Sequence, residues 1–188
     1  MKTSNAWLTL VVLLAVHGSA RSDFIATATL TGDGESPSTG TGYGTVTFNA
    51  AAQTLTALLT FSDLTSPTEI PPGVPGAAHI HLGAPGVEGP ILFPFLNFPT
   101  GETSGSYSTM LTAANLISPL PDSITSFADA VSAIEAGHTY FNIHTVAFPG
   151  GEIRGQLTVV PEPASLTLLT LGLGGILAIA RFGRRLAV

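Results

Sequence analysis

The sequence predicts a mainly β fold: an antiparallel β-sandwich or Greek-key barrel of seven to eight short strands, with one helix near residues 123–136 and a C-terminal transmembrane helix. Apolar and polar residues alternate with a period of two in several short segments. Stretches rich in glycine, proline and serine separate these segments, and residues 123–135 instead carry apolar residues at helical spacing. Short strands joined by turns are typical of sandwiches and barrels.

The expected strands follow one another along the chain. Residues 24–31 form the first, residues 45–49 and 54–61 a hairpin, residues 79–82, 89–95 and 105–110 three short strands, and residues 139–145 and 152–159 the last two. Residues 32–44 and the proline-rich residues 63–76 are expected to be loops. The helix is expected to begin after Asp122 or Ser123 as N-cap and to end at Gly137.

Residues 1–20 have the features of a signal peptide. Lys2 precedes an apolar run from Trp7 to Val16 that is too short to span a membrane, and small residues at 18 and 20 suit cleavage after Ala20. Signal peptidase would then be a partner during export. A buried N-terminal helix is the alternative. The expected domain covers residues 21–159.

Residues 160–188 contain a second targeting pattern. Pro161, Glu162 and Pro163 precede an apolar segment, expected to cross the membrane over residues 165–182, and then Arg181, Arg184 and Arg185. This order resembles the PEP-CTERM sorting signal of bacteria, and the resemblance implies recognition by an exosortase and removal of the helix. A plain single-span membrane anchor is the alternative.

Composition excludes several functions. The chain has no cysteine, so a disulfide framework, a thiolate zinc site and a cysteine nucleophile are impossible. Between residues 21 and 160 there are eleven acidic residues and two arginines, a balance of −9. Such a surface repels nucleic acid, so no nucleic-acid partner is expected.

Three histidines are candidate metal ligands. His79 and His81 lie two apart in a predicted strand, so their rings share a face. Strand parity places His144 on the same outer face, while Phe141 and Ile143 point inward, so the three rings are expected to gather beneath the proline-rich loop. Imidazole suits copper or zinc. His138 lies about 20 Å along the strand from His144 and is excluded from this site. The alternative is that the histidines hydrogen-bond to loop backbones and hold the loops on the sheet.

A glycine-rich turn precedes the last strand. Gly150 and Gly151 follow Pro149 and form a turn that needs positive φ, and Glu152 and Arg154 lie two apart on the outer face, where a mutual or cross-strand ion pair is expected. This turn and the strand Gly155-Gln156-Leu157, together with Ala78-His79-Ile80-His81, resemble the CHRD domain over residues 25–157. The resemblance implies an extracellular β-domain.

A weaker resemblance is to copper/zinc superoxide dismutases. His79, His81, His144 and Arg154 follow the order of a His-x-His strand, a later histidine and an arginine in those enzymes. The sequence lacks counterparts of the bridging histidine, the zinc cluster and the disulfide.

Two functional hypotheses follow. In the first, the chain is an exported, non-enzymatic CHRD-domain protein, anchored in the inner membrane by its C-terminal helix before processing and then at the cell surface or outside, which binds matrix or exopolysaccharide components. In the second, it is a copper- or zinc-binding, dismutase-like protein that uses His79, His81 and His144.

Overall fold

The computed structural model describes residues 21–32 and 37–161, and these residues form one antiparallel β-sheet with a single α-helix. The strands are β1 (Phe24–Thr31), β2 (Thr41–Asn49), β3 (Thr54–Ser62), β4 (Ala78–Leu82), β5 (Ile91–Pro94), β6 (Gly105–Leu111), β7 (Thr139–Ile143), β8 (Ile153–Gln156) and β9 (Thr158–Val159). A 3₁₀ turn covers Ala113–Asn115, and the helix α1 covers Phe127–Glu135.

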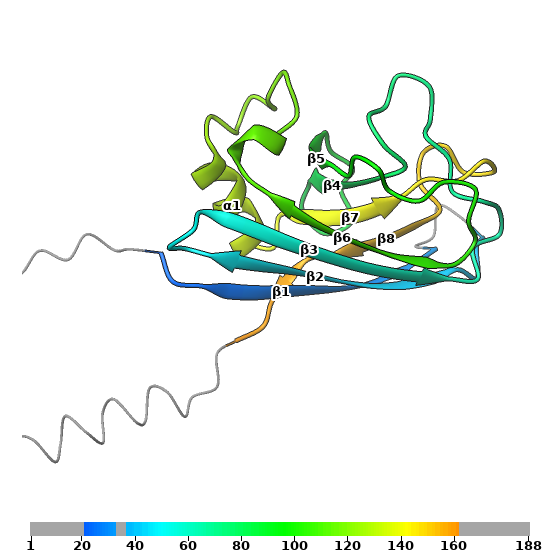
Figure 1. Cartoon of the computed structure of the whole chain (residues 1–188), viewed down its shortest axis with the longest axis horizontal. Helices are drawn as coiled ribbons and strands as arrows, with labels where there is room; N and C mark the ends of the chain where they lie inside the picture. The colour runs from blue at the N-terminus through cyan, green and yellow to red at the C-terminus, as the bar shows by residue number, and fades with distance from the viewer. Residues whose placement is uncertain (1–20, 33–36, 162–188) are drawn as a thin grey trace, which may run out of the picture.

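The sheet curls into a nearly closed barrel. Its strand order is β5-β4-β7-β8-β1-β2-β3-β6, with β9 paired to β1. The two outermost strands approach each other, because Tyr107 of β6 packs on Phe95 just after β5 and donates a hydrogen bond from its hydroxyl to the Leu96 carbonyl oxygen at 2.6 Å. The long strands β1, β2 and β3, with β6 paired to β3, form one wall of the barrel, and the short strands β4, β5, β7 and β8 form the other (Figure 1). The predicted antiparallel, mainly β fold is confirmed.

The barrel interior is filled by every second residue of the strands. Leu30, Phe48 and Leu59 are inward-pointing and almost fully buried, and the intervening residues of the same strands are mainly threonines exposed on the outside. The expected inward positions of Phe141 and Ile143 in β7 are confirmed, since both side chains are fully buried. Burial of these large apolar side chains is the main source of stability.

Strand β2 is longer than expected. It begins at Thr41, although residues 41–44 were predicted to be loop because of their glycines. Gly44 lies inside the barrel, where a Cβ atom would approach Cε2 of Phe141 to 2.5 Å. Because Gly44 has no side chain, the Phe141 ring of the opposite wall has room to pack there, and this glycine does not indicate a turn. The predicted last strand is divided into β8 and β9 at Leu157, which donates its N–H to the Thr139 carbonyl oxygen.

Helix α1 begins three to four residues later than predicted. Ser126 is its N-cap, and its hydroxyl oxygen accepts a hydrogen bond from the N–H of Asp129. The predicted caps, Asp122 and Ser123, lie in a preceding turn closed by a hydrogen bond from the Ile124 N–H to the Pro121 carbonyl oxygen. Ile124 lies in this turn and its side chain is buried, so it matches the apolar spacing of a helix without belonging to one. The predicted terminator is confirmed, since Gly137 follows the helix with a φ of 71°.

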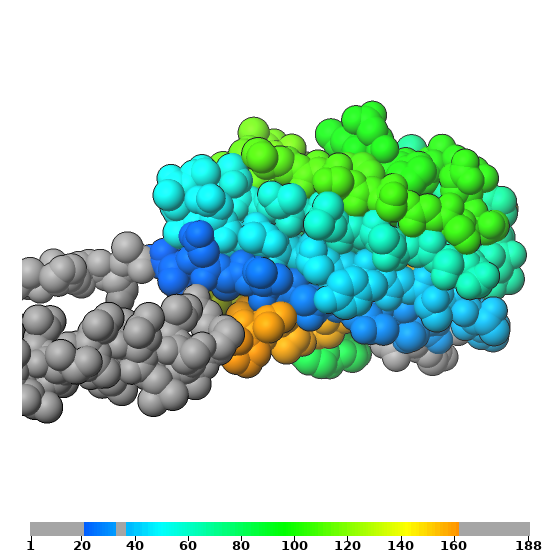
Figure 2. All heavy atoms as spheres, turned by 60° about the horizontal axis from the view of Figure 1, so that its bottom comes forward, coloured from blue at the N-terminus to red at the C-terminus, as the bar shows by residue number. Residues whose placement is uncertain are grey.

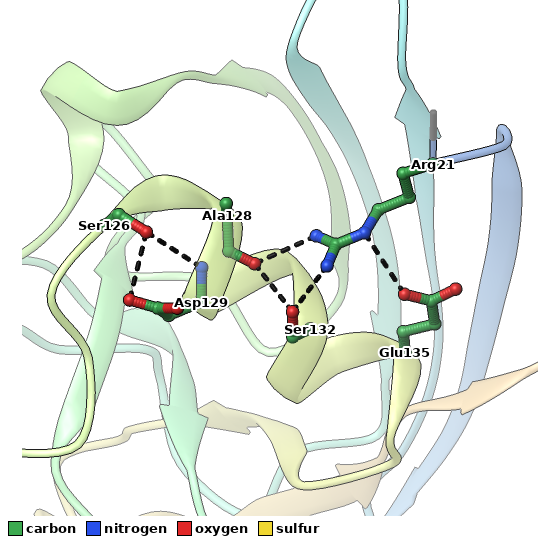
Figure 3. Close-up of polar contacts among 6 residues, drawn as sticks. All are labelled: Arg21, Ser126, Ala128, Asp129, Ser132 and Glu135. Atoms are coloured by element: carbon green, nitrogen blue, oxygen red, sulfur yellow. Dashed lines mark hydrogen bonds and ion pairs between the residues drawn. The ribbon is translucent and has the colours of Figure 1, made fainter. Parts of the chain in front are cut away.

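Arg21 fastens the start of the described chain to α1 (Figure 3). Its guanidinium group donates hydrogen bonds to the Ala128 carbonyl oxygen at 2.9 Å and to the Ser132 hydroxyl at 2.6 Å, and its Nε lies 3.4 Å from a carboxylate oxygen of Glu135. These contacts bring residue 21 beside the helix that packs near β9.

Several predictions concern residues outside the described ranges. They are the signal peptide with its cleavage after Ala20, the transmembrane segment 165–182, and the sorting residues Glu162, Pro163, Arg181, Arg184 and Arg185. Within residues 21–32 and 37–161, no helix has the length and apolarity needed to cross a membrane.

Candidate metal centre

Three histidine rings meet on the outside of the barrel wall formed by β4 and β7. In the register of these strands His79 lies opposite Asn142 and His81 opposite Tyr140, and His144 directly follows β7. One ring nitrogen from each histidine lies within 4.8 Å of the other two. Among the residues that the structure describes, this is the one such cluster of possible metal ligands, and it does not include His138.

The cluster lies on the outer face of the sheet but is buried beneath loops. The exposed fractions of His79, His81 and His144 are 0%, 9% and 4%. Three loop segments lie over the rings and offer them the carbonyl oxygens of Pro75, Gly89 and Pro149. Loops therefore bury this part of the outer face of the sheet, so the three rings lie in an environment like that of the protein interior.

Each histidine makes one hydrogen bond to a backbone carbonyl. Nε2 of His79 lies 3.1 Å from the Pro75 oxygen, Nδ1 of His81 lies 2.9 Å from the Gly89 oxygen, and Nδ1 of His144 lies 2.8 Å from the Pro149 oxygen. A carbonyl oxygen only accepts, so these three nitrogens must carry the hydrogens. We assign the tautomers on this basis: Nε2–H in His79, and Nδ1–H in His81 and His144.

The three remaining nitrogens then present lone pairs to one another. Nδ1 of His79 lies 2.9 Å from Nε2 of His144, a distance at which two lone pairs repel unless a proton or a metal ion lies between them. Nε2 of His81 is buried and has no hydrogen-bond partner among the described residues. An unsatisfied buried nitrogen costs about 1–3 kcal/mol, so this arrangement is unfavourable without a further group.

Burial keeps the histidines neutral. Burial, together with smaller contributions from the neighbouring His144 and His81, lowers the pKa of His79 to about 3. Burial likewise lowers the pKa of His81 to about 4, against a smaller opposing effect of its bond to Gly89, and it lowers the pKa of His144. Neutral imidazole is the form that binds a metal ion, so at neutral pH no protons must be displaced from the three nitrogens.

A pocket of about 210 Å³ lies beside His81. Its lining includes Glu88, Tyr140 and Arg154. The Tyr140 ring stacks on His81 with centroids 5.1 Å apart, and the Arg154 guanidinium carbon lies 4.2 Å from the centre of the same tyrosine ring. The pocket therefore places charged groups of both signs, Arg154 with Glu88 and Glu152, and a partly open space next to the histidine cluster.

The glycine turn before β8 is confirmed, but only Gly151 has positive φ. The turn is closed by a hydrogen bond from the Gly151 N–H to the Phe148 carbonyl oxygen at 3.0 Å. Gly151 has a φ of 130°, and a Cβ there would lie 2.1 Å from Oδ1 of Asn142. Asn142 in turn donates to the Gly150 carbonyl oxygen at 3.0 Å, which fixes the loop that carries Pro149.

Among the described residues Glu152 and Arg154 do not pair with each other, and a cross-strand ion pair of Arg154 stays a prediction. Glu152 is 1% exposed, and its carboxylate accepts hydrogen bonds from the Ser38 hydroxyl, the Thr65 N–H and the Thr145 hydroxyl at 2.5, 2.5 and 2.7 Å. Arg154 lies over Tyr140 and donates to the Val87 carbonyl oxygen at 3.3 Å. Glu152 precedes β8, so strand parity does not govern where its side chain points.

Burial alone raises the pKa of the Glu152 carboxyl, but the three donated hydrogen bonds outweigh it and hold this pKa below the usual value. The charged carboxylate joins three segments that are distant in sequence. This role of Glu152 was not predicted from the sequence. Hydrogen bonds from the histidines to loop backbones were predicted as the alternative to a metal site, but their acceptors, the carbonyls of Pro75, Gly89 and Pro149, were not. Their only signal was the clustering of proline and glycine in the loops on both sides of β4 and after His144.

The comparison with known families confirms both resemblances found in the sequence, to the CHRD domain and to the PEP-CTERM sorting signal. Residues 26–157 match the CHRD domain, and residues 159–185 match the PEP-CTERM protein-sorting motif. Searches of curated proteins and of solved structures gave no match. The chain therefore belongs to the CHRD domain family, and its PEP-CTERM motif makes it an exported protein that an exosortase sorts to the cell surface or the exterior.

Proposed function

We propose that this exported protein binds one copper or zinc ion through Nδ1 of His79 and Nε2 of His81 and His144. One observation carries the proposal: each of the three rings sets one nitrogen against a backbone carbonyl and turns its other nitrogen toward the same buried site. Hydrogen bonds from the non-ligating nitrogen to a carbonyl are the usual way in which proteins orient histidine ligands.

The spacing of the nitrogens supports the proposal. Nitrogens bound to one zinc ion lie about 2.0–2.1 Å from it, so no two of them are more than about 4 Å apart. The three nitrogens here lie within 4.8 Å of one another, and small rotations of the rings would bring them into range. Three protein ligands beside a pocket leave a fourth position for water or another small ligand, as in open zinc sites.

A purely structural role of the histidines explains the contacts of only one nitrogen in each ring. Hydrogen bonds to Pro75, Gly89 and Pro149 do hold loops on the sheet, as a structural role requires. That role leaves Nε2 of His81 unsatisfied and sets two lone pairs 2.9 Å apart. A metal ion would satisfy all three nitrogens at once, so we favour metal binding.

The test is a metal titration of the purified exported protein. We expect one saturable site for Zn²⁺ or Cu²⁺ with a dissociation constant below micromolar by isothermal titration calorimetry. In His81→Ala the affinity should fall by at least about 100-fold, since a direct ligand matters at least as much as an outer-shell partner. His138→Ala is the matched control, because His138 is exposed and outside the cluster, and it should bind like the wild type. Absence of stoichiometric binding below micromolar, or equal losses in both variants, would refute the metal site.

We propose binding without catalysis as the first function and dismutase-like redox activity as the second candidate. The second is favoured by Arg154, which lines the pocket next to His81 as a positive charge. It is tested by measuring superoxide consumption by the copper-loaded protein. A rate no higher than that of copper-loaded His81→Ala would leave metal binding in place and remove the redox function.

The finer steps of export are also proposals. We propose that signal peptidase cleaves after Ala20, and that the segment 165–182 holds the protein in the inner membrane until the exosortase acts. Changing Arg184 and Arg185 together to alanine should alter retention or processing, because these charges hold the end of the span on the cytoplasmic side. Mass spectrometry of the mature protein measures this, and an unchanged mass and location would count against it. Binding of matrix or exopolysaccharide components remains a proposal without support from the buried histidine site.

A further inference from the structure

The wall of the barrel opposite the histidine cluster has an unusual outer surface. We call it the hydroxyl face and define it as the outward residues of four neighbouring strands: every second residue of β1 from Ile25 to Thr31, of β2 from Thr41 to Asn49, of β3 from Thr54 to Ser62, and of β6 from Ser106 to Met110. Nine of these residues are threonines and three are serines. None of them is buried. Figure 2 shows this side of the molecule, where the side chains of the four strands form one continuous surface.

The hydroxyl face carries no charge. No Asp, Glu, Lys or Arg occurs anywhere in β1, β2, β3 or β6, although residues 21–160 contain eleven acidic residues and two arginines. Surfaces of soluble proteins normally mix charged residues, which keep them apart in solution. Here the charges are confined to the rest of the domain.

The hydroxyl groups form ordered rows across the strands. The register places Thr29 next to Tyr43, Tyr43 next to Thr60, and Thr60 next to Ser106, with a parallel row of Thr27, Thr45, Leu58 and Ser108 beside it. Adjacent strands are about 4.8 Å apart, and outward residues of one strand repeat at about 6.7 Å. The rows therefore offer hydroxyls at regular spacings in two directions.

Most of these hydroxyls remain available. Within the described residues, the side-chain hydrogen bonds made by threonine and serine of this face are one between Thr41 and Ser62 and one from Thr60 to the Tyr43 carbonyl oxygen, both at 3.3 Å. The Tyr43 side chain is half exposed, and its hydroxyl has no partner among the described residues. It stands in one of the central rows as the single aromatic ring of the face.

We infer that the hydroxyl face binds a neutral polysaccharide laid across the strands. A sugar chain offers hydroxyls that donate to and accept from rows of threonine and serine, and its apolar C–H faces pack on an aromatic ring such as Tyr43. Lack of charge matches a neutral ligand, because no ionised side chain must be stripped of water when the chain docks. The site is separate from the histidine cluster and does not depend on the metal.

Other occupants fit less well. Nucleic acids and acidic polysaccharides are repelled by the balance of −9, and the face has no lysine or arginine to attract them. Protein interfaces are enriched in aromatic residues, Met and Arg and depleted in Ser. This face has one aromatic residue, one Met and no Arg, and its four exposed apolar side chains, Ile25, Tyr43, Leu58 and Met110, stand among twelve Thr and Ser residues. A second copy of the chain is therefore a weaker candidate than a sugar polymer.

The test is a pull-down of the purified exported protein with three insoluble neutral polysaccharides: cellulose, chitin and starch. EDTA is present, so the metal site plays no part. We expect saturable binding to at least one of them and none to covalently cross-linked carboxymethyl-dextran beads, an acidic polymer that EDTA does not dissolve. Tyr43→Ala should weaken this binding between about twofold and tenfold, the range for loss of one aromatic contact.

A charge placed on the face gives a sharper comparison. Thr60→Glu should weaken binding by more than about tenfold, because a neutral polymer cannot pair with the carboxylate that it covers. Thr100→Glu is the matched control, since Thr100 is also exposed but lies in the loop before β6, and it should bind like the wild type. Circular dichroism and thermal unfolding confirm that all variants are folded.

The outcomes decide the proposal. Binding that falls in Tyr43→Ala and Thr60→Glu but not in Thr100→Glu supports it. Binding to none of the three neutral polymers, or binding that all variants share, overturns it. So does a dimer in analytical ultracentrifugation that Thr60→Glu separates, because the face would then belong to a second copy. None of these results affects the test of the metal site.

Discussion

Replacing Glu152 by alanine should destabilise the protein by about 3 kcal/mol at neutral pH. The carboxylate is buried and accepts hydrogen bonds from three segments: Ser38 before β2, Thr65 after β3, and Thr145 after β7. Alanine removes the acceptor for all three. The Thr65 N–H then has no partner in its place, and the loop that supplies Pro149 to His144 loses its attachment.

The magnitude follows from opposing contributions. Each hydrogen bond to a charged group contributes about 1.5–3 kcal/mol, so three of them give an upper bound of several kcal/mol. Burial of the carboxylate costs part of this, and the Ser38 and Thr145 hydroxyls can turn to other partners in the variant. About 3 kcal/mol remains, which corresponds to a fall in melting temperature of about 10 °C for a domain of this size.

Glu152→Gln is the matched control. Its amide oxygen can accept from Ser38 and Thr65, and its amide nitrogen can donate to the Thr145 hydroxyl, so only the charge is lost. We expect a destabilisation of about 1 kcal/mol. The two variants therefore separate the loss of the hydrogen bonds from the loss of the charge.

The pH dependence has a defined sign. The folded-state pKa of Glu152 is lowered, so its contribution is fully present above the unfolded-state pKa and is lost as the pH falls through the folded-state pKa. We would measure the free energy of unfolding in urea from neutral to acidic pH. The wild type should be more stable than Glu152→Gln at neutral pH, and this difference should disappear at pH values below the usual pKa of a carboxyl group. If alanine changes the free energy of unfolding by less than about 1 kcal/mol at pH 7, Glu152 does not join the loops as we argue.

Three further predictions test other parts of the structure. Gly44→Ala should cost about 1–3 kcal/mol in urea unfolding, because its Cβ would lie 2.5 Å from Phe141, whereas Gly150→Ala, with no atom within 4 Å, should change little. Arg21→Ala should lower stability by no more than about 1 kcal/mol, because its contacts with α1 are partly exposed; a larger fall in melting temperature would contradict this. Nitrogen NMR of the metal-free protein should find the hydrogen on Nε2 of His79 but on Nδ1 of His81, and the reverse assignment would remove the basis of the proposed ligand set.

The periodic part of the fold could be predicted from the sequence. Strand β1 was predicted with its observed bounds, and parity placed Phe141 and Ile143 inside. Errors arose where a residue serves tertiary packing instead of local structure. Gly44 was predicted to be a loop residue, because its contact with Phe141 lies across the barrel and leaves no local pattern. Ile124 was predicted to be helical, because a buried residue in a turn can match the apolar spacing of a helix.

The site could be predicted in part for the same reason. Residues two apart in a strand share a face, so the sequence indicated that His79 and His81 point the same way, and the structure places His144 beside them. The sequence indicated that the proline-rich loop lies over the three rings, but it could not indicate how completely they are buried, because the covering loops have no periodic pattern. Nor could it place Glu152, whose partners lie 114 and 87 residues away in the chain at Ser38 and Thr65.

The two walls of the barrel differ in what lies outside them, and this difference separates the two proposed sites. Loops cover the wall of β4 and β7, so polar side chains there lose contact with water and must find partners inside the protein. Neutral histidines with converging lone pairs fit that setting only if a further group joins them. No loop among the described residues covers the wall of β1, β2, β3 and β6, so its hydroxyls can exchange water for a ligand. A small ion therefore suits the first wall and an extended neutral polymer the second, and a variant in one site should leave binding at the other unchanged.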